Sequence, residues 1–328
     1  MITLGFALAL GHSYLDTIKS SDLKEYVTFL ASDDMKGRNT PSPELDKAAD
    51  YIAAEFKKYG VKPANEETYF QVAEWTRGKG AGQKVRNVIG VIPGSDPVLS
   101  KEYIIVSAHY DHLGENLNLQ GDDKIYNGAD DDASGVAGVI EIGKALAKEK
   151  LKRSVILMTF YGEEKFMVGS KYYVDHPVFP LKQTIANVNI EQIGRTDDTE
   201  APRVSAGSLT GFNFSSIGPT FARIGEKMGV PVTGHPKYSA AYFAASDNLF
   251  FALAGVPAHT ICTAFEFPDY HKVGDSADKL DYDNMAKIVK LSAAVVVDIA
   301  NAAKPPAWNK DEPKAAKYAE AGAKLYGG

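Results

Sequence analysis

The sequence predicts an α/β domain in which a mostly parallel central β-sheet is flanked by helices on both faces. Short runs of β-branched and aliphatic residues, typical of buried strands, alternate with longer segments whose apolar residues recur at helical spacing. Such alternation indicates strand–helix–strand units and therefore a parallel sheet. Of the 328 residues, 45% are hydrophobic and 24% are charged, which is an ordinary globular composition.

The expected elements follow from these patterns in chain order. Helical spacing of apolar residues predicts helices over 22–31 and 44–59, and Gly60 is a typical stop after the second. Strands are expected at 86–94, 102–108, 154–160, 184–190 and 257–262. Further helices are expected at 133–149, from about residue 169, at 218–228 and at 283–301. We expect these elements to form one domain over residues 21–303.

Composition excludes several kinds of partner. The net charge of −6 provides no electrostatic footprint for nucleic acid or for an anionic membrane surface. No stretch approaches the roughly 20 apolar residues of a membrane span. A single cysteine, Cys262, excludes an internal disulfide and a cysteine-rich zinc module, and it is expected to pack as a small buried hydrophobe.

The two ends of the chain differ from the rest. Residues 1–20 begin with MITLGFALALGHS, in which Ala7-Leu8-Ala9 resembles the end of a signal peptide. The alternative for this segment is a short buried or frayed N-terminus; the signal-peptide interpretation predicts a secreted or periplasmic protein. Residues 304–328 are rich in Pro, Ala and Lys, which predicts a peripheral tail.

Histidines and carboxylates follow the predicted central strands. His109 ends one strand, the pair Glu163-Glu164 follows the next, Glu191 follows a third, and His271 comes nine residues after Cys262. In an open α/β sheet, ligands bind outside the carboxyl ends of the strands. Each residue alone has an ordinary interpretation as a capping or solvated group, but their coincidence at one sheet edge predicts a metal cluster.

The stretch NGADDDASGVAG adds three consecutive aspartates, Asp130 to Asp132, before a small apolar helix start. One or two of them are explained as helix-capping acids. Together with the strand-end residues they form a His/carboxylate set that suits Zn²⁺, with Mn²⁺ or Co²⁺ as possible substitutes. Five or six ligands exceed the needs of one tetrahedral ion, so we expect two ions sharing a carboxylate.

Five motifs carry a resemblance to a known family. AHYDHLG, NGADDDASGVAG, FYGEEKFMVGS, NVNIEQIG and DYHKVGDSADKLD occur in the order and spacing of the M28 zinc peptidases, the co-catalytic aminopeptidase group. The segment LKEYVTFLASDDMKGRNTPS also resembles the lead-in of bacterial secreted members. The resemblance covers roughly residues 20–300 and implies the zinc-aminopeptidase fold. Too few residues separate the strands at 86–94 and 102–108 for the protease-associated insert domain of some relatives.

The resemblance implies a role for each motif residue. The implied metal ligands are His109, Asp131 as the bridging carboxylate, Glu164, Glu191 and His271. Asp111 would orient His109, and the peptide bond after Asp131 would be cis, with Asp130 and Asp132 as neighbours. Glu163 matches the general base. Tyr270 matches a tyrosine that stabilises the oxyanion in some members.

The resemblance leaves the roles of two positions undecided. The ligand after NVNI is usually Asp in the family, whereas this chain has Glu191, whose longer side chain changes the geometry at that metal. Other members place the oxyanion tyrosine near the segment SDN, where Tyr242 is a rival to Tyr270.

The implied activity is that of a di-zinc aminopeptidase or dipeptidase acting on peptides with a free N-terminus. Glu163 would take a proton from the attacking water and return it to the leaving amine. Two alternatives are a single-zinc glutaminyl cyclase and a non-catalytic binding module on the same scaffold. The complete ligand set and the Glu163-Glu164 pair argue against both.

Overall fold

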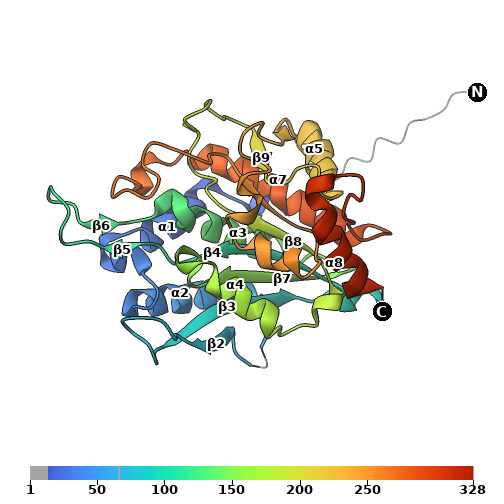
Figure 1. Cartoon of the computed structure of the whole chain (residues 1–328), viewed down its shortest axis with the longest axis horizontal. Coiled ribbons are helices and arrows are strands. Elements are labelled where there is room, and N and C mark those ends of the chain that lie inside the picture. The colour runs from blue at the N-terminus through green and yellow to red at the C-terminus, as the bar shows by residue number, and fades with distance from the viewer. Residues whose placement is uncertain (1–13, 66, 328) are drawn as a thin grey trace, which may run out of the picture.

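The computed structural model describes residues 14–65 and 67–327, and the predicted signal-peptide residues 1–13 lie outside this part of the chain. Within it, nine strands form one sheet in the order β1-β3-β7-β4-β8-β11-β9-β10, and β2 pairs with β3. The strands are β1 (Lys62–Pro63), β2 (Phe70–Glu74), β3 (Lys84–Ile92), β4 (Tyr103–His109), β7 (Ser154–Phe160), β8 (Thr184–Ile190), β9 (Gly207–Leu209), β10 (Val232–Thr233) and β11 (Ala258–Cys262). A separate two-stranded hairpin, β5 (Gly114–Glu115) and β6 (Ile125–Tyr126), projects from the body of the molecule (Figure 1).

The centre of the sheet is parallel, as predicted. Strand β4 pairs in parallel with β7 on one side and with β8 on the other, and β8 pairs in parallel with β11. Outside this centre, β3 runs antiparallel to β7, and β9 runs antiparallel to β11. The carboxyl ends of the four central strands therefore lie at one edge of the sheet.

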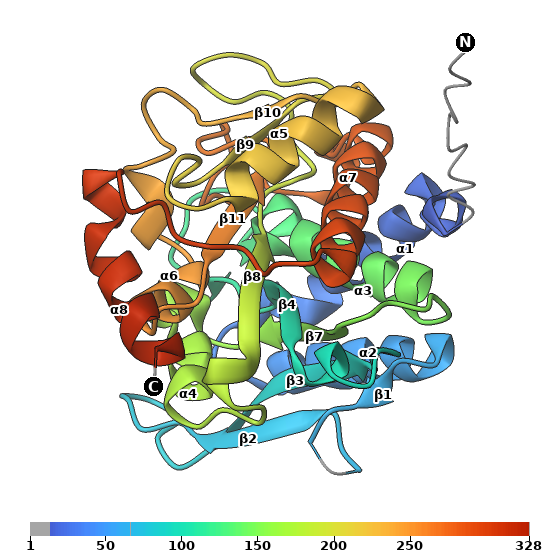
Figure 2. The same cartoon turned by 90° about the vertical axis from the view of Figure 1, so that its right-hand side faces the viewer.

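Helices cover both faces of the sheet (Figure 2). Helices α1 (Ser20–Leu30), α2 (Pro43–Tyr59), α3 (Gly135–Leu146) and α7 (Tyr282–Asn301) lie on one side, and α4 (Val168–Asp175), α6 (Asn248–Leu253) and α8 (Ala316–Tyr326) lie on the other. Helix α5 (Ile217–Met228) packs beside β10 and α7.

Successive side chains of the central strands enter opposite cores. In β7, Val155 and Leu157 belong to the core under α3, whereas Ile156 and Met158 belong to the core under α4 and α6. This period of two follows from strand geometry. Because both faces are covered, SVILMTF is buried throughout and mostly apolar, and this run of apolar residues is what predicts a buried parallel strand.

The structure departs from two sequence expectations. The helix expected at 133–149 is preceded by a π-helical turn over Ala129–Ser134, which contains all three aspartates, and α3 itself ends at Leu146. The C-terminal segment 304–328, expected to be peripheral, is anchored by helix α8. Its residues Trp308, Ala315 and Tyr318 are buried in the core on the α6 side, because the rings of Trp308 and Tyr318 pack against Phe243.

Candidate metal centre

Three parallel strands deliver acidic and histidine side chains to one edge of the sheet. His109 is the last residue of β4, Glu163 and Glu164 begin the 3₁₀ turn Glu163–Lys165 after β7, and Glu191 directly follows β8. Because β4 lies between β7 and β8, these residues are adjacent in space although they are far apart in sequence.

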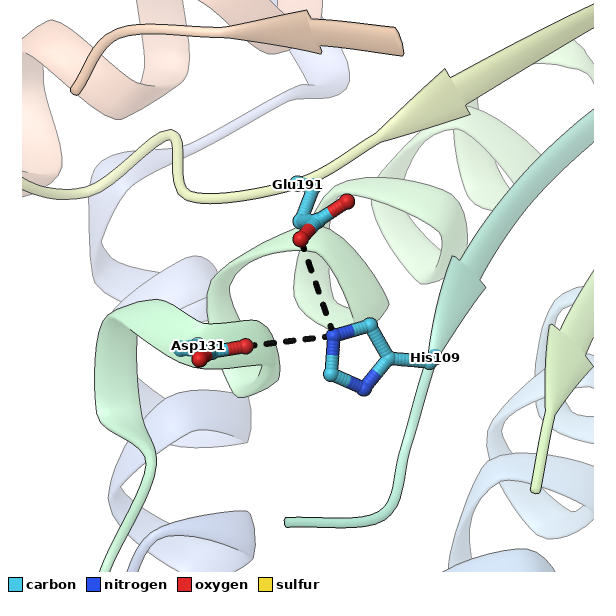
Figure 3. A group of neighbouring side chains, drawn as sticks. All are labelled: His109, Asp131 and Glu191. Atoms are coloured by element: carbon cyan, nitrogen blue, oxygen red, sulfur yellow. Dashed lines mark ion pairs between the residues drawn. The ribbon is translucent and has the colours of Figure 1, made fainter. Parts of the chain in front are cut away.

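The side chains of His109, Asp131 and Glu191 converge (Figure 3). His109 Nε2 lies 3.1 Å from Asp131 Oδ1 and 4.0 Å from Glu191 Oε1. Ligand atoms bound to a tetrahedral Zn²⁺ at 2.0–2.1 Å lie roughly 3.3 Å apart. The three donors therefore have spacings close to those that one ion requires.

A second group shares Asp131 through its other carboxylate oxygen. His271 Nε2 lies 3.1 Å from Asp131 Oδ2 and 3.3 Å from Glu164 Oε1, again close to the spacing around one ion. His112 reaches the same place, since its Nδ1 lies 2.8 Å from Glu164 Oε1 and 3.9 Å from Asp131 Oδ2. The two oxygens of Asp131 thus face two separate donor groups.

The three neighbouring aspartates have different partners, which explains how they tolerate one another. Asp130 Oδ1 accepts hydrogen bonds from the backbone N–H groups of Gly194 and Arg195, at 2.6 and 3.0 Å. Asp132 accepts from the N–H groups of His109, Gly135 and Gln192, and so links β4, the start of α3 and the end of β8. Only Asp131 faces the donor groups, and the peptide bond between Asp131 and Asp132 is cis.

Buried atoms without a hydrogen-bond partner mark the place of a cation. Among the described residues they include His109 Nε2 and Glu191 Oε2, which belong to the first donor group. Buried polar atoms in proteins are almost always paired. Their clustering within one constellation of imidazole and carboxylate donors fits zinc, which would satisfy them together.

The pKa values of the buried carboxylates also indicate a place for a cation. Burial raises the pKa of Glu191 to about 7, and the charge of Asp131 adds to this effect against the opposing influence of His109. Burial likewise raises the pKa of Glu163, with Glu191 and Asp247 contributing. Such shifts report negative charge that lacks a counterion, and divalent cations would supply it.

The pKa of the histidine in the second donor group is also raised, which favours its charged form. Although burial would lower it, the pKa of His271 is raised to about 10 by hydrogen bonds to Asp131 and Glu164. The same histidine contacts hold the pKa of Asp131 well below its ordinary value despite burial. A metal ligand must be neutral imidazole, so ions entering the site would displace these protons.

A second layer of contacts orients the donors. His109 Nδ1 lies 3.1 Å from the backbone oxygen of Asp111 and 3.6 Å from its carboxylate. That carboxylate accepts hydrogen bonds from Thr40 Oγ1 and from the backbone N–H of Glu163. Asp111 therefore fixes both the His109 ring and the start of the Glu163 turn, as expected for the outer partner of a metal-bound histidine.

The two candidate tyrosines have different surroundings. Tyr270 stacks on His271 with ring centroids 4.0 Å apart. Burial and the nearby carboxylates raise its pKa, which keeps the phenol protonated as a donor. The hydroxyl of Tyr242 instead donates to Glu266. Of the two, Tyr270 is the one whose hydroxyl has no protein acceptor among the hydrogen bonds of the described residues.

A cavity of about 100 Å³ opens beside Glu191. Its wall includes Thr260 and Cys262 of β11, Phe265 and both tyrosines, and Glu191 is the only ionisable carboxylate or basic group in it. Cys262 is buried there, as the sequence predicts. The cavity lies at the β8–β11 side of the donor groups.

Sequence reasoning missed three members of this site. His112 contacts Glu164. Asp275 binds the backbone N–H groups of Asp130 and Asp131. Burial raises the pKa of Asp247 to about 7, and the charge of Asp247 in turn raises the pKa of Glu163. All three lie in segments that the sequence analysis singled out, His112 in AHYDHLG, Asp275 in DYHKVGDSADKLD and Asp247 in SDN, but residue type alone did not show which positions of each segment contact the site.

The fold and the donor set define an α/β metallopeptidase-type domain. The model of peptidase family M28 matches residues 87–296, well over half of the chain. The chain belongs to this family.

Curated relatives include a probable zinc metalloprotease of Pyrenophora tritici-repentis, 33% identical over 46% of this chain and 30% of the relative. Another is aminopeptidase YwaD of Bacillus subtilis, 24% identical over 78% of this chain and 54% of the relative. The chain thus spans only about a third to a half of the length of these two relatives.

Two solved structures from Bacteroides thetaiotaomicron share the fold. One is a leucine aminopeptidase precursor, with a TM-score of 0.70 and 19% identity over 86% of this chain and 97% of that chain. The other is a glutaminyl cyclase, with a TM-score of 0.68 and 18% identity over 86% of this chain and 98% of that chain. At these identities the likeness concerns the fold, so the choice of activity depends on the site.

Proposed function

We propose that this chain is a di-zinc exopeptidase that hydrolyses the N-terminal peptide bond of peptides, as an aminopeptidase or dipeptidase. One observation carries the proposal: Asp131 presents its two carboxylate oxygens to two different donor groups, at 3.1 Å from His109 Nε2 and 3.1 Å from His271 Nε2. A shared carboxylate between two sites is the arrangement that two-metal hydrolases use.

In this proposal His109, Asp131 and Glu191 hold one ion, and Asp131, Glu164 and His271 hold the other. Bound zinc ions would supply Lewis acidity at a carbonyl oxygen and activate a water. The carboxylate of Glu163, 4.0 Å from His109 Nε2, takes a proton from the attacking water and later gives it to the leaving amine.

The glutaminyl cyclase and the non-catalytic module are alternatives with the same fold. Both are disfavoured here, because the site keeps the Glu163-Glu164 pair and complete donor groups on both sides of Asp131. The structure contains no helix among the described residues that is long and apolar enough to cross a membrane. A secreted or periplasmic location remains a prediction from the sequence of residues 1–20.

The test is metal stoichiometry together with turnover. Chelation should abolish hydrolysis of an amino-acid anilide, and added Zn²⁺ should restore it together with two ions per chain by elemental analysis. Mn²⁺ or Co²⁺ are possible substitutes. His271→Ala should keep one ion. His112→Ala should keep two, because His112 contacts Glu164 and is not one of the proposed ligands. A zinc-supplemented, folded protein with one ion or none would contradict the proposal.

We further propose that Tyr270 donates a hydrogen bond to the oxyanion. Tyr270→Phe should lower kcat by about 10²-fold, the usual cost of removing one such donor, while both ions stay bound. Tyr242→Phe is the matched control, because its hydroxyl is engaged by Glu266, and it should cost far less. A larger loss of kcat in Tyr242→Phe than in Tyr270→Phe would assign the role to Tyr242.

A further inference from the structure

Phe166 stands out on the surface beside the metal centre. Its side chain is 79% exposed, the largest exposed fraction of any large hydrophobic residue in the described part of the chain. It directly follows the turn Glu163–Lys165, so only about 7 Å of chain separates its Cα from that of Glu164. An exposed aromatic ring at this position contributes little to the core.

The backbone of Phe166 is also held in an unfavourable conformation. Its φ is 72°, and Met167 follows with a φ of 54°. A bulky residue in this left-handed region is uncommon and costs free energy, so such positions persist where the surroundings enforce them and concentrate at functional sites. Core packing therefore does not explain why an exposed aromatic residue stands at this position.

Hydrogen bonds fix the turn that carries Phe166. The N–H of Met167 donates to the oxygen of Glu163 at 2.8 Å, and the N–H of Val168 donates to the oxygen of Gly162 at 3.0 Å. From the neighbouring loop, Arg77 Nη1 donates to the oxygen of Lys165 at 3.0 Å. Phe166 is thus presented at a defined place rather than on a loose loop.

The sheet order places Phe166 on the side of the site opposite the cavity. Glu163 and Phe166 follow β7, whereas the cavity beside Glu191 is lined from β11. Strands β4 and β8 lie between β7 and β11. If the side chain of the N-terminal residue occupies the cavity, the remainder of the peptide continues past Glu163 toward β7.

The role of Glu163 also indicates that the peptide continues past Glu163 toward β7. A group that returns a proton to the leaving amine must lie within hydrogen-bond reach of that nitrogen. The second residue of the peptide begins at this nitrogen, and its side chain is therefore carried into the neighbourhood of Phe166.

We infer that Phe166 is a specificity-determining residue that contacts the side chain of the second residue of the substrate and favours peptides with an apolar residue there. This inference rests on the proposed function, since it needs the scissile bond to lie between the cavity and Glu163. An apolar contact of this kind typically discriminates by tenfold or somewhat more.

The test compares two substrates that differ only at the second residue, Ala-Leu-NH₂ and Ala-Gly-NH₂, with the zinc-loaded full chain. Wild type should show the higher kcat/KM for Ala-Leu-NH₂. In Phe166→Gly and Phe166→Asn, both suited to a left-handed backbone, this preference should fall about tenfold, with most of the loss on Ala-Leu-NH₂. Phe166→Leu should retain most of the preference.

Val98→Asn is the matched control, because Val98 is 74% exposed but precedes β4 and so lies toward the opposite end of the sheet. It should keep the wild-type preference. If wild type, Phe166→Gly and Phe166→Asn all turn over the amides with the same preference, the inference about Phe166 is overturned while the proposed function stands. Absence of turnover of both amides by zinc-loaded wild type would overturn the proposed function and the inference with it.

Discussion

Glu163→Gln should lose at least about a hundredfold in kcat while both metal ions stay bound and KM changes little. General-base catalysis typically contributes 10²–10⁴-fold, and the amide of glutamine cannot accept and return the proton. The backbone N–H of Glu163 donates to Asp111, a contact that the substitution leaves in place, so the turn should keep its conformation. The measurements are steady-state kinetics and elemental analysis on the same preparation.

Glu164→Gln is the matched control for this prediction. Glu164 follows the same strand, but its Oε1 lies 3.3 Å from His271 Nε2 and 2.8 Å from His112 Nδ1. This variant should lose affinity for one ion, and excess Zn²⁺ should partly restore its activity. The reverse pattern would exchange the roles of the two glutamates, and two variants that keep both metal and rate would contradict the hydrolase mechanism.

Asp131→Asn should lose both ions and reduce turnover by at least about a thousandfold. Each carboxylate oxygen faces a separate donor group, so one substitution weakens both sites at once. Loss of metal removes several kcal/mol of transition-state stabilisation, which corresponds to a factor of this size. Zinc titration by calorimetry, followed by kinetics at saturating Zn²⁺, measures both effects.

Thermal unfolding separates the loss of metal from the loss of the fold. Zinc should raise the Tm of wild type, because an ion that binds only the folded state at 100 times its Kd adds about 2.7 kcal/mol. Asp131→Asn should fold without this rise. Asp130→Asn should keep the zinc-dependent rise, because Asp130 Oδ1 binds the N–H groups of Gly194 and Arg195. An Asp131→Asn protein that retains two ions would show that the carboxylate does not bridge them.

Parts of the fold and site could be read from local sequence. Strands β4, β7 and β8 are buried along almost their whole length because both faces of the sheet are covered, so most of their residues are apolar. The site residues stand where these strands end. Since parallel strands share one carboxyl edge, the sequence predicts that His109, Glu163 and Glu191 meet there.

Other features have no local signal. Strands β9 and β10 have three and two residues, which are too few to show a hydrophobic period. They form because β9 pairs with β11 and β10 pairs with β9. The tail 304–328 looks polar in sequence, yet Trp308 and Tyr318 are buried because a distant surface receives them. Long-range packing decides such elements, and propensity does not report it.

Strand ends and the order of the motifs predict which residues can hold metal and that these residues meet at one edge of the sheet. Which of several neighbouring acids or histidines contacts the donor groups is seen only in the folded structure. Asp131 faces the donor groups while Asp130 and Asp132 bind backbone N–H groups, and His112 and Asp275 join the site from loops. Backbone torsions and contacts with distant elements set the side-chain orientation of adjacent residues. A local stretch of sequence therefore does not show which of them faces the metal centre.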